Sequence, residues 1–272
     1  MQDFRIRATL CTSNLHRVAL APARLQLEAD SLSPAARKLR FLKRLRCTLR
    51  FERQAWQAGA RRVAGVDEAG RGSLFGPVVA AAVILDPERP IRGLRDSKLL
   101  PEKVREDLAV CIRERALACA VAEVDAAEID RINIYQASRL AMRQAVARLA
   151  LPPDHLLVDA MVLDWAGSQT RIIHGDARSA SVAAASILAK VERDRLLRQW
   201  DGVFPQYGLA AHKGYGTPQH LESLRRHGPS PMHRQSFAPV WDSTRPQELL
   251  EFMLREKDAE DAEAAALPLR RD

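Results

Sequence analysis

The apolar residues of this chain gather in a central region of short runs, with two more polar ends. The segment RVAGVDEAGRG, from residue 62, is a short β-type run that meets a glycine-rich turn. GPVVAAAVIL follows it and has the continuous apolar character of a buried strand, so the two are expected to pair as a hairpin. Further strands are predicted at 119–124, 155–160 and 170–174.

Helix-type spacing of apolar residues alternates with the later strands. The pattern predicts helices at 101–118, at 126–149 and at about 179–200, and the prolines at 152 and 153 end the second of these. The segment SVAAASILAK in the third helix lacks bulky side chains, which lets a helix lie close to a neighbouring backbone. Strands that first meander and then alternate with helices indicate an α/β domain with a mixed sheet.

The chain is predicted to have three parts: a basic N-terminal extension at 1–51, partly helical or disordered, a folded domain at 52–242 with a small helical C-terminal lobe, and a polar tail at 243–272. Apolar residues among the basic ones predict a cationic amphipathic helix within 31–50. Three interpretations of the extension stay open: a solvated segment, an arm that binds duplexes, and a wrongly assigned start codon.

The composition fits one domain but does not settle its partner. The 272 residues, 47% of them hydrophobic, suffice for one well-buried domain with appendages. The net charge of +8 belongs to the N-terminal segment, because residues 1–62 hold 14 Lys or Arg against 4 Asp or Glu, whereas residues 63–242 hold 23 against 22. A near-neutral domain does not exclude nucleic acid, since basic groups that bind phosphates can offset an acidic metal site.

Membrane association is not expected, because no run approaches the roughly 18 apolar residues that a membrane span needs. The four cysteines are scattered and form no CxxC pair, which indicates reduced thiols in a cytoplasmic protein. The first 25 residues lack the apolar core of a secretory signal, although their Arg and Ser/Thr content resembles an organellar transit sequence. Nothing in the sequence indicates an obligate oligomer, so a monomer is expected.

Four acidic residues stand at the ends of predicted strands. Asp67 and Glu68 end an apolar run, Asp159 closes LLVD, and Asp176 follows RIIH before a helix. An isolated acidic pair is usually a turn or a salt bridge, but carboxylates at buried strand ends are costly unless a cation neutralises them. Acids that converge at one sheet edge make an oxygen-rich site suited to a pair of Mg²⁺ or Mn²⁺ ions, whereas zinc would require closely spaced His or Cys.

Other phosphate-binding motifs do not fit the glycine-rich turn. Gly70, Gly72 and Gly76 give GxGxxxG followed by a second strand, not the strand–loop–helix of a dinucleotide-binding fingerprint. The tetrapeptide DEAG at 67–70 is similar to the acidic motif of a helicase, but that motif needs a GxxxxGK[ST] loop upstream. No Gly-Lys dipeptide occurs in this chain.

Five blocks of the sequence resemble the ribonuclease HII family in order and spacing. They are GVDEAGRGSLFGPVVAAAVIL (65–85), DSKLL (96–100), IDRINIYQAS (129–138), GDARSASVAAASILAKVERD (175–194) and FPQYGLAAHKGYGT (204–217). The resemblance covers about residues 52–240 and implies a ribonuclease H-like mixed five-stranded sheet flanked by helices. It also implies a metal-dependent endoribonuclease that cuts the RNA of RNA–DNA hybrids, and cuts 5′ of ribonucleotides in duplex DNA, leaving 3′-hydroxyl and 5′-phosphate ends.

The resemblance selects the same four acids as the strand-end pattern. Asp67, Glu68, Asp159 and Asp176 match the family's catalytic acids, which bind two divalent metal ions. One position departs from the family pattern, because Gly usually follows the third acid and this chain has Ala160 there. Asp164 lies close behind, so the choice of Asp159 over Asp164 stays open.

The resemblance also implies a set of substrate-binding residues. The turn formed by Gly70, Arg71 and Gly72 matches the one that contacts the ribonucleotide 2′-hydroxyl. Tyr215 matches the tyrosine that packs on the sugar beside the cut. Positions near the nucleic-acid backbone are matched by Ser97, Lys98 and Lys213. Taken alone, each of these would more often be a turn, loop or surface residue.

Four further polar residues are not predicted to take part in catalysis. Arg193 and Asp194 are interpreted as structural, because Asp194 follows Lys190 by four residues on one helix face and can pair with it. His212 and His233 lack metal-ligand spacing, so no zinc role is expected.

Two functions compete with cleavage of RNA–DNA hybrids and of ribonucleotides in duplex DNA. One is a two-metal nuclease acting on DNA junctions, against which the Gly70–Gly72 turn and Tyr215 argue. The other is a duplex-binding protein that uses the basic N-terminal arm, against which the four acids argue, since without metal they would repel phosphates.

Overall fold

The computed structural model describes Ser33 and residues 45–244 of the chain. The polar tail at 243–272, apart from its first two residues, and the greater part of the helix predicted within 31–50 fall outside these residues. The compact unit that contains the sheet begins at Cys47.

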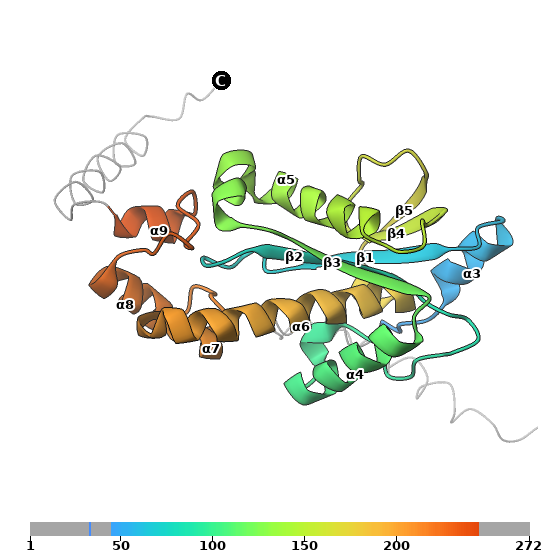
Figure 1. Cartoon of the computed structure of the whole chain (residues 1–272), viewed down its shortest axis with the longest axis horizontal. Helices are drawn as coiled ribbons and strands as arrows, with labels where there is room; N and C mark the ends of the chain where they lie inside the picture. The colour runs from blue at the N-terminus through green and yellow to red at the C-terminus, as the bar shows by residue number, and fades with distance from the viewer. Residues whose placement is uncertain (1–32, 34–44, 245–272) are drawn as a thin grey trace, which may run out of the picture. The chain divides into compact units, whose positions relative to one another are not determined.

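A mixed five-stranded sheet lies at the centre of the fold (Figure 1). Its strands are β1 (Val63–Ala69), β2 (Val78–Ile84), β3 (Ala118–Val124), β4 (His155–Asp159) and β5 (Ser168–Ile172), in the order β3-β2-β1-β4-β5. β2 pairs antiparallel with both β1 and β3, whereas β1–β4 and β4–β5 are parallel pairs. The predicted hairpin and the predicted mixed sheet are both confirmed.

Helices cover both faces of this sheet. The helices are α3 (Arg50–Gln57), α4 (Glu102–Arg115), α5 (Ala126–Ala147), α6 (Ala180–Val203), α7 (Leu209–His212), α8 (Pro218–His227) and α9 (Ala238–Ser243), with short 3₁₀ turns η1 (Ser97–Leu99), η2 (Gly175–Ala177) and η3 (Pro205–Tyr207). Figure 1 shows α5 on one face and α6 with α4 on the other, while α7, α8 and α9 gather at one end as the expected helical lobe. Among the described residues, no helix combines the length and apolar character needed to cross a membrane.

Small residues bring α6 against β1. Ala183, Ala184 and Ala185 of α6 are fully buried. Gly65 of β1 faces the start of the helix, and a Cβ added there would lie 2.1 Å from the carbonyl carbon of Ser181. The close approach expected from the segment SVAAASILAK is therefore confirmed, and it fixes the end of α6 that lies nearest the acidic residues.

The helix predicted at 126–149 is interrupted near its start. Asn133 adopts φ 66° and ψ 161° inside α5, a conformation that only glycine adopts easily. Its side-chain oxygen accepts hydrogen bonds from the backbone N–H groups of Tyr135 (3.0 Å) and Gln136 (3.1 Å), and so caps the second half of the helix. Apolar spacing predicted one helix because such a cap does not interrupt the hydrophobic pattern.

The helix α3 is anchored in the compact unit through Glu52. This carboxylate is 1% exposed and accepts hydrogen bonds from the hydroxyls of Ser179 and Ser181, each 2.6 Å long, and from the backbone N–H of Ser181 at 2.9 Å. The sequence placed the start of the domain at residue 52, whereas the compact unit starts at Cys47. The physical reason is that Thr48 pairs with the start of α6: its N–H donates to the carbonyl of Arg178 at 3.2 Å, and its carbonyl accepts from Ala180 N at 3.1 Å.

Candidate active site

The sheet register brings the first three predicted acids together. Val66 of β1 lies beside Val158 of β4 in a parallel pair, so the next residues, Asp67 and Asp159, lie on neighbouring strands at the same end of the sheet. Asp67 is only 4% exposed, and Glu68 follows it at the same end of β1. The convergence expected from strand ends is therefore present in the structure.

The fourth acid returns to this edge through a sharp bend after β5. His174 adopts a left-handed conformation with φ 56°, and η2 then places Asp176, which is 5% exposed, directly before α6. The backbone N–H of Gly175 donates a hydrogen bond of 2.7 Å to Asp159 Oδ1. This bond ties the loop of the fourth acid to the third acid.

Asp164 does not belong to this group of acids. Its side chain is 78% exposed and pairs with Arg143 of α5 at 3.3 Å. Asp159, in contrast, interacts electrostatically with Asp67, Glu68 and Asp176. The geometry thus favours Asp159, and Ala160 after it has a positive φ of 48°, the conformation for which glycine is suited.

Burial and mutual repulsion dominate the electrostatics of the site. Burial raises the pKa of Asp67 well above its usual value, and Glu68, Asp159 and Asp176 raise it further. Burial also raises the pKa of Glu68, although nearby Arg71 opposes the change, and it raises the pKa of Asp159 against the hydrogen bond from Gly175. Several carboxylates in one buried site need positive charge to remain ionised together.

Two basic side chains lie against the acids. Lys98 Nζ is 3.2 Å from Asp176 Oδ2, and Arg71 Nη1 is 3.3 Å from Glu68 Oε1. Burial alone would lower the pKa of Lys98, but Asp176 and Asp96 raise it. Both cations therefore balance part of the negative charge.

The donor set fits divalent metal ions. Among the described residues, no three His, Cys, Asp or Glu side chains already have the spacing of a formed metal site. Glu68 Oε2, however, is buried and has no hydrogen-bond partner, which leaves an oxygen ligand without a donor or cation. Clustered carboxylate oxygens are the ligands that Mg²⁺ and Mn²⁺ prefer.

A groove of about 610 Å³ opens beside the acids. Six of the seven predicted substrate-binding residues line it, namely Gly70, Arg71, Gly72, Ser97, Lys98 and Tyr215. Lys213 does not line the groove, because its ammonium group donates a hydrogen bond to the carbonyl of Ala210. The groove holds the acidic residue Glu68 and the expected sugar-binding residues in one continuous surface.

The glycine-rich turn has different requirements at its two glycines. Gly70 has φ 93°, and a Cβ added there would lie 2.0 Å from Nε of Arg193, so no other residue fits. A Cβ at Gly72 would meet no atom within 4 Å. The open space at Gly72 lets another molecule approach the backbone of the turn.

Three buried residues support the site, and the sequence indicated a structural role only for Arg193. Asp96 is 2% exposed, accepts a hydrogen bond from Lys98 N at 2.9 Å, and has its pKa raised by burial and by Asp176. Arg193 and Arg234 are fully buried beneath the turn. The only sequence signal for Asp96 is its place at the start of the block DSKLL, and Arg234 carries no such signal.

The two buried arginines hold backbone carbonyls around the turn. Arg193 donates to the carbonyls of Phe75 (3.2 Å) and Lys213 (3.0 Å), and Arg234 donates to that of Arg71 (2.9 Å). The structural role expected for Arg193 agrees with these contacts. They tie the turn to the loop that carries Tyr215.

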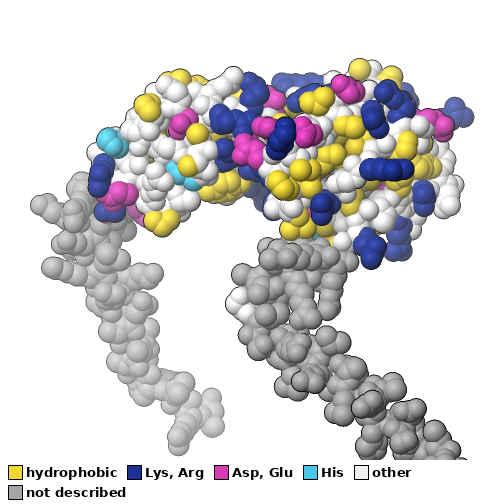
Figure 2. Space-filling model, turned by 90° about the horizontal axis from the view of Figure 1, so that it is seen from below, with side chains coloured by type: hydrophobic (Ala, Val, Ile, Leu, Met, Phe, Trp, Pro, Cys, Tyr) yellow, Lys and Arg dark blue, Asp and Glu magenta, His cyan; other side chains and the backbone are white. Residues whose placement is uncertain are grey.

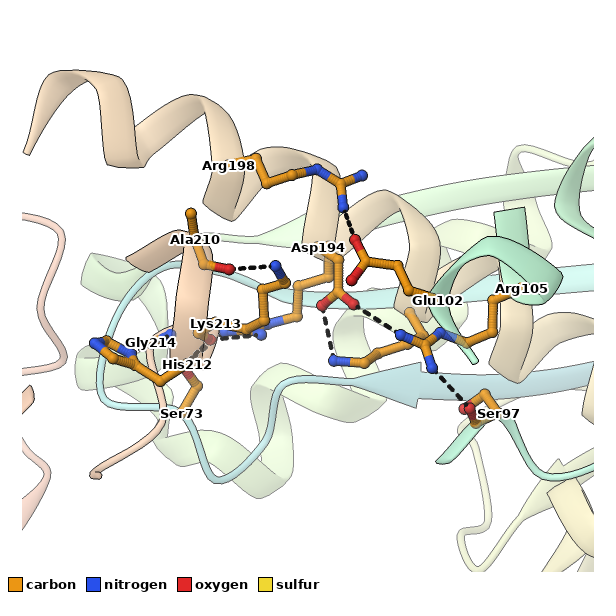
Figure 3. Close-up of polar contacts among 12 residues, drawn as sticks. Ser73, Ser97, Glu102, Arg105, Asp194, Arg198, Ala210, His212, Lys213 and Gly214 are labelled. Carbon is orange, nitrogen blue, oxygen red and sulfur yellow. Dashed lines mark hydrogen bonds and ion pairs between the residues drawn. The ribbon is translucent and has the colours of Figure 1, made fainter. Parts of the chain in front are cut away.

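Asp194 links α6 to α4, as Figure 3 shows. It accepts a hydrogen bond of 2.7 Å from Lys190, which is the predicted pairing, and lies 3.6 Å from Arg105 Nη2. Lys190 and Arg105 both line the groove. The ion pairs therefore fix two cationic side chains at its wall.

Figure 2 shows the face on which α4 and α6 lie, with Lys and Arg side chains spread over it and a group of Asp and Glu side chains near its middle. Ion pairs between the two helices include Arg113–Glu192 at 3.4 Å and Arg198–Glu106 at 3.0 Å. Positive charge on this face is therefore partly neutralised within the protein.

The mixed sheet, the four carboxylates at one edge and the adjoining groove together define a hydrolase of the ribonuclease H type. The family model for ribonuclease HII matches residues 64–240, and the chain belongs to the ribonuclease HII family. It is therefore a nuclease that acts on RNA in RNA–DNA hybrids.

Similar proteins of known family agree with this assignment. Ribonuclease HII of Koribacter versatilis (strain Ellin345) is 62% identical over 229 residues, which cover 84% of this chain and 90% of that protein. Ribonuclease HII of Geobacillus kaustophilus (strain HTA426) is 54% identical over 202 residues, covering 74% and 78% respectively.

Two solved structures share the fold. The ribonuclease H2 of Pyrococcus horikoshii OT3 has a TM-score of 0.59 and 27% identity, covering 67% of this chain and 97% of that one. A chain of the PCNA:RNase HII complex from Archaeoglobus fulgidus has a TM-score of 0.58 and 28% identity, covering 68% and 98%.

Proposed function

We propose that this enzyme, besides cutting RNA–DNA hybrids, cuts duplex DNA on the 5′ side of embedded ribonucleotides and leaves 3′-hydroxyl and 5′-phosphate ends. One observation carries the proposal: Glu68, the Gly70–Gly72 turn and Tyr215 line a single groove, and Asp67 precedes Glu68 on the same strand. A site that cleaves beside a ribose needs its hydrolytic groups and its sugar-binding groups within one nucleotide of each other.

Asp67, Glu68, Asp159 and Asp176 would hold two Mg²⁺ or Mn²⁺ ions. When bound, such a pair supplies activation of a water molecule and stabilisation of the leaving oxygen of a phosphodiester. Two observations support metal binding by these carboxylates: Oε2 of Glu68 has no hydrogen-bond partner, and burial and acidic neighbours raise the pKa of Asp67.

The chain's own residues would bind and orient the substrate. Lys98 and Arg71 lie at the groove wall with charge opposite to that of a phosphate. The backbone at Gly72 is open to a sugar edge, where a 2′-hydroxyl distinguishes RNA from DNA. Tyr215 is 39% exposed, so a neighbouring sugar can pack on its side chain.

A single cleavage experiment tests this function. A labelled DNA duplex that contains one ribonucleotide is incubated with the protein and Mg²⁺ or Mn²⁺, beside an all-DNA duplex and the variant Asp67→Asn. We expect one metal-dependent cut 5′ of the ribonucleotide, none in the all-DNA duplex, and a loss of about a thousandfold in the variant, as removal of about 4 kcal/mol of transition-state stabilisation would give.

Other outcomes would favour the competing functions. Cleavage of the all-DNA control at a junction would support a DNA-junction nuclease. Tight duplex binding without any cut would support a binding module. The monomeric state and the cytoplasmic location stay predictions of the sequence.

A further inference from the structure

The segment that follows the Gly70–Gly72 turn lies between two loops of the C-terminal lobe. Ser73 forms a β-bridge with Tyr215 on one side, and Phe75 forms one with His233 on the other. Leu74 N donates to the carbonyl of Gly214 at 2.9 Å, while its own carbonyl accepts from Arg234 N at 2.9 Å. The turn is thus continuous with a bridged segment whose two neighbours carry Tyr215 and His233.

Two buried imidazoles join these neighbours to each other. His220 Nε2 is 3.1 Å from His233 Nε2, and His220 Nδ1 is 3.0 Å from the carbonyl oxygen of Tyr215. Both side chains are completely buried. His220 and His233 therefore close a hydrogen-bonded connection from one loop to the other.

Only one arrangement of protons satisfies all of these hydrogen bonds. The Tyr215 carbonyl can only accept, so His220 Nδ1 must donate and His220 Nε2 of the neutral ring must accept. His233 Nδ1 accepts from the backbone N–H of Ser230 at 2.9 Å, which leaves His233 Nε2 to donate to His220. The chain of hydrogen bonds then runs in one direction, from Ser230 to Tyr215.

Burial keeps both rings neutral and so preserves this arrangement. Burial lowers the pKa of His220 to about 4 despite the hydrogen bond to Tyr215, and burial together with His220 lowers the pKa of His233 to about 3. A third ring, His212, stacks on His220 at 4.6 Å and accepts from Gly214 N at 3.2 Å. The residue before Tyr215 is thereby held by the same group of rings.

We propose that His220, oriented by His233, is a positioning residue that holds Tyr215 at a fixed place relative to the Gly70–Gly72 turn and so supports recognition of the junction between ribose and deoxyribose. The inference rests on the proposed function, because it requires Tyr215 to pack on the sugar beside the cut.

Tyr215 is partly exposed, so the hydrogen bonds of its backbone bear on where its ring lies. The residue is 39% exposed, and the cations above its ring are Arg193 at 5.6 Å and Lys190 at 5.9 Å. The position of its backbone therefore determines where the ring lies. An apolar residue at 220 would fill the same space without fixing the carbonyl, which retains only the bond from Thr217 N at 2.8 Å.

Two substitutions of His220 separate positioning from packing. In His220→Asn the side-chain amide takes the place of Nδ1, so it can still donate to the Tyr215 carbonyl, but it loses His233. In His220→Gln the amide takes the place of Nε2, so it can reach His233 but not Tyr215. Each variant removes one of the two hydrogen bonds, so we expect similar decreases in Tm for both.

The readout is the ratio of kcat/KM on a single-ribonucleotide duplex, which contains the junction, to kcat/KM on a uniform RNA–DNA hybrid. We expect His220→Gln to lower this ratio about tenfold or more, mainly through kcat, because a small displacement of a positioning group costs chiefly in the reacting complex. For His220→Asn we expect the ratio to stay within about threefold of the wild type, on the same geometric argument.

A double-substitution test identifies Tyr215 as the intermediary. In a Tyr215→Ala background, His220→Gln should no longer change the ratio, since residues that act through one another are not additive. If His220→Gln does not fold, His220→Leu removes the same hydrogen bond to the Tyr215 carbonyl, and a selective loss in the same direction is expected.

Three results would overturn the proposal. Equal losses on both substrates in the two His220 variants would show a purely structural role. An unchanged effect of His220→Gln in the Tyr215→Ala background would show that His220 does not act through Tyr215. If the wild-type enzyme cuts the hybrid but not the single-ribonucleotide duplex, the proposed function fails first, and this inference fails with it.

Discussion

At the scale of single residues, Asp67 makes the stability of the metal-free protein depend on pH. Burial and the neighbouring acids raise its pKa above the unfolded value, so the folded state binds more protons than the unfolded state between the two pKa values. Stability contributed by this group is therefore present at low pH and is lost as the pH rises through the folded pKa. We expect Asp67→Asn to be more stable than the wild type in EDTA, with a larger difference at pH 8 than at pH 5.

Urea unfolding of both proteins at the two pH values measures this difference. Mg²⁺ should stabilise the wild type and have little effect on the variant, since binding to the folded state alone adds stability. Asp164→Asn is the matched control, because Asp164 is exposed and lies outside the acidic group. A gain for Asp67→Asn that is equal at both pH values would contradict this account of the site.

Ala160, directly after the third acid, offers a second test at the residue scale. It is exposed and has φ 48°, and the left-handed conformation costs a non-glycine residue roughly 1–2 kcal/mol. Ala160→Gly should therefore raise the free energy of unfolding by up to about 1 kcal/mol after the extra chain entropy of glycine is subtracted. Cleavage should be retained, because the hydrogen bond from residue 160 N–H to the Ile172 carbonyl involves only the backbone.

The same Ala→Gly substitution in a helix should lower, not raise, the free energy of unfolding. Ala147 is the exposed last residue of α5, where glycine gains no relief of strain and its chain entropy should lower stability by up to about 0.5 kcal/mol. Chemical denaturation of Ala160→Gly and Ala147→Gly side by side checks the pair. Destabilisation of both variants would mean that Ala160 is not strained.

At the scale of elements, the strands and the main helices could be predicted because each has its own apolar pattern. The four acids could be predicted as one site because parallel strands such as β1 and β4 end at the same edge. The bend at Asn133 and the anchoring of α3 could not, because both depend on polar side chains that bond to backbone or to distant helices. A polar residue such as Glu52 has the same sequence signature whether it is solvated or buried.

Glu52 therefore provides the test at this scale. Its carboxylate binds the N-terminus of α6, where the helix dipole and the free N–H groups favour negative charge. Glu52→Ala should lower the free energy of unfolding by about 3 kcal/mol, because hydrogen bonds to a charged group contribute about 1.5–3 kcal/mol each and their buried partners would be left unpaired. Activity should fall as well, since η2 with Asp176 lies directly before this end of α6.

Thermal unfolding with and without Mg²⁺ measures the effect. Glu114→Ala, an exposed position on α4, is the control and should change stability by no more than about 0.5 kcal/mol. If Glu52→Ala lowered the free energy of unfolding no more than this control does, α3 would not contribute to the stability of the catalytic domain.

At the scale of the whole molecule, the site depends on contacts between segments that are far apart in the chain. Arg193 and Arg234 reach the carbonyls around the turn from α6 and from the C-terminal lobe, and His220 reaches Tyr215 within that lobe. Local patterns carry no information about such pairings, which is why the sequence indicated the acids and the turn but not the residues that hold them. The lobe thus contributes Tyr215 to a groove that lies beside acids from the sheet and from η2.

The distribution of charge over the whole chain leads to the last prediction. Residues 1–46, which precede the compact unit, contain ten Lys or Arg against three Asp or Glu, whereas the catalytic domain is nearly neutral. A chain that begins at Cys47 should therefore keep its kcat on a hybrid but bind it more weakly, with a salt dependence of log K that is shallower by about 0.9 for each phosphate that is no longer neutralised. Fluorescence anisotropy with a labelled hybrid from 50 to about 300 mM salt, beside kcat at saturating substrate, separates the two effects. An unchanged salt slope would mean that the basic segment does not bind the duplex, and an abolished kcat would mean that it belongs to the catalytic machinery.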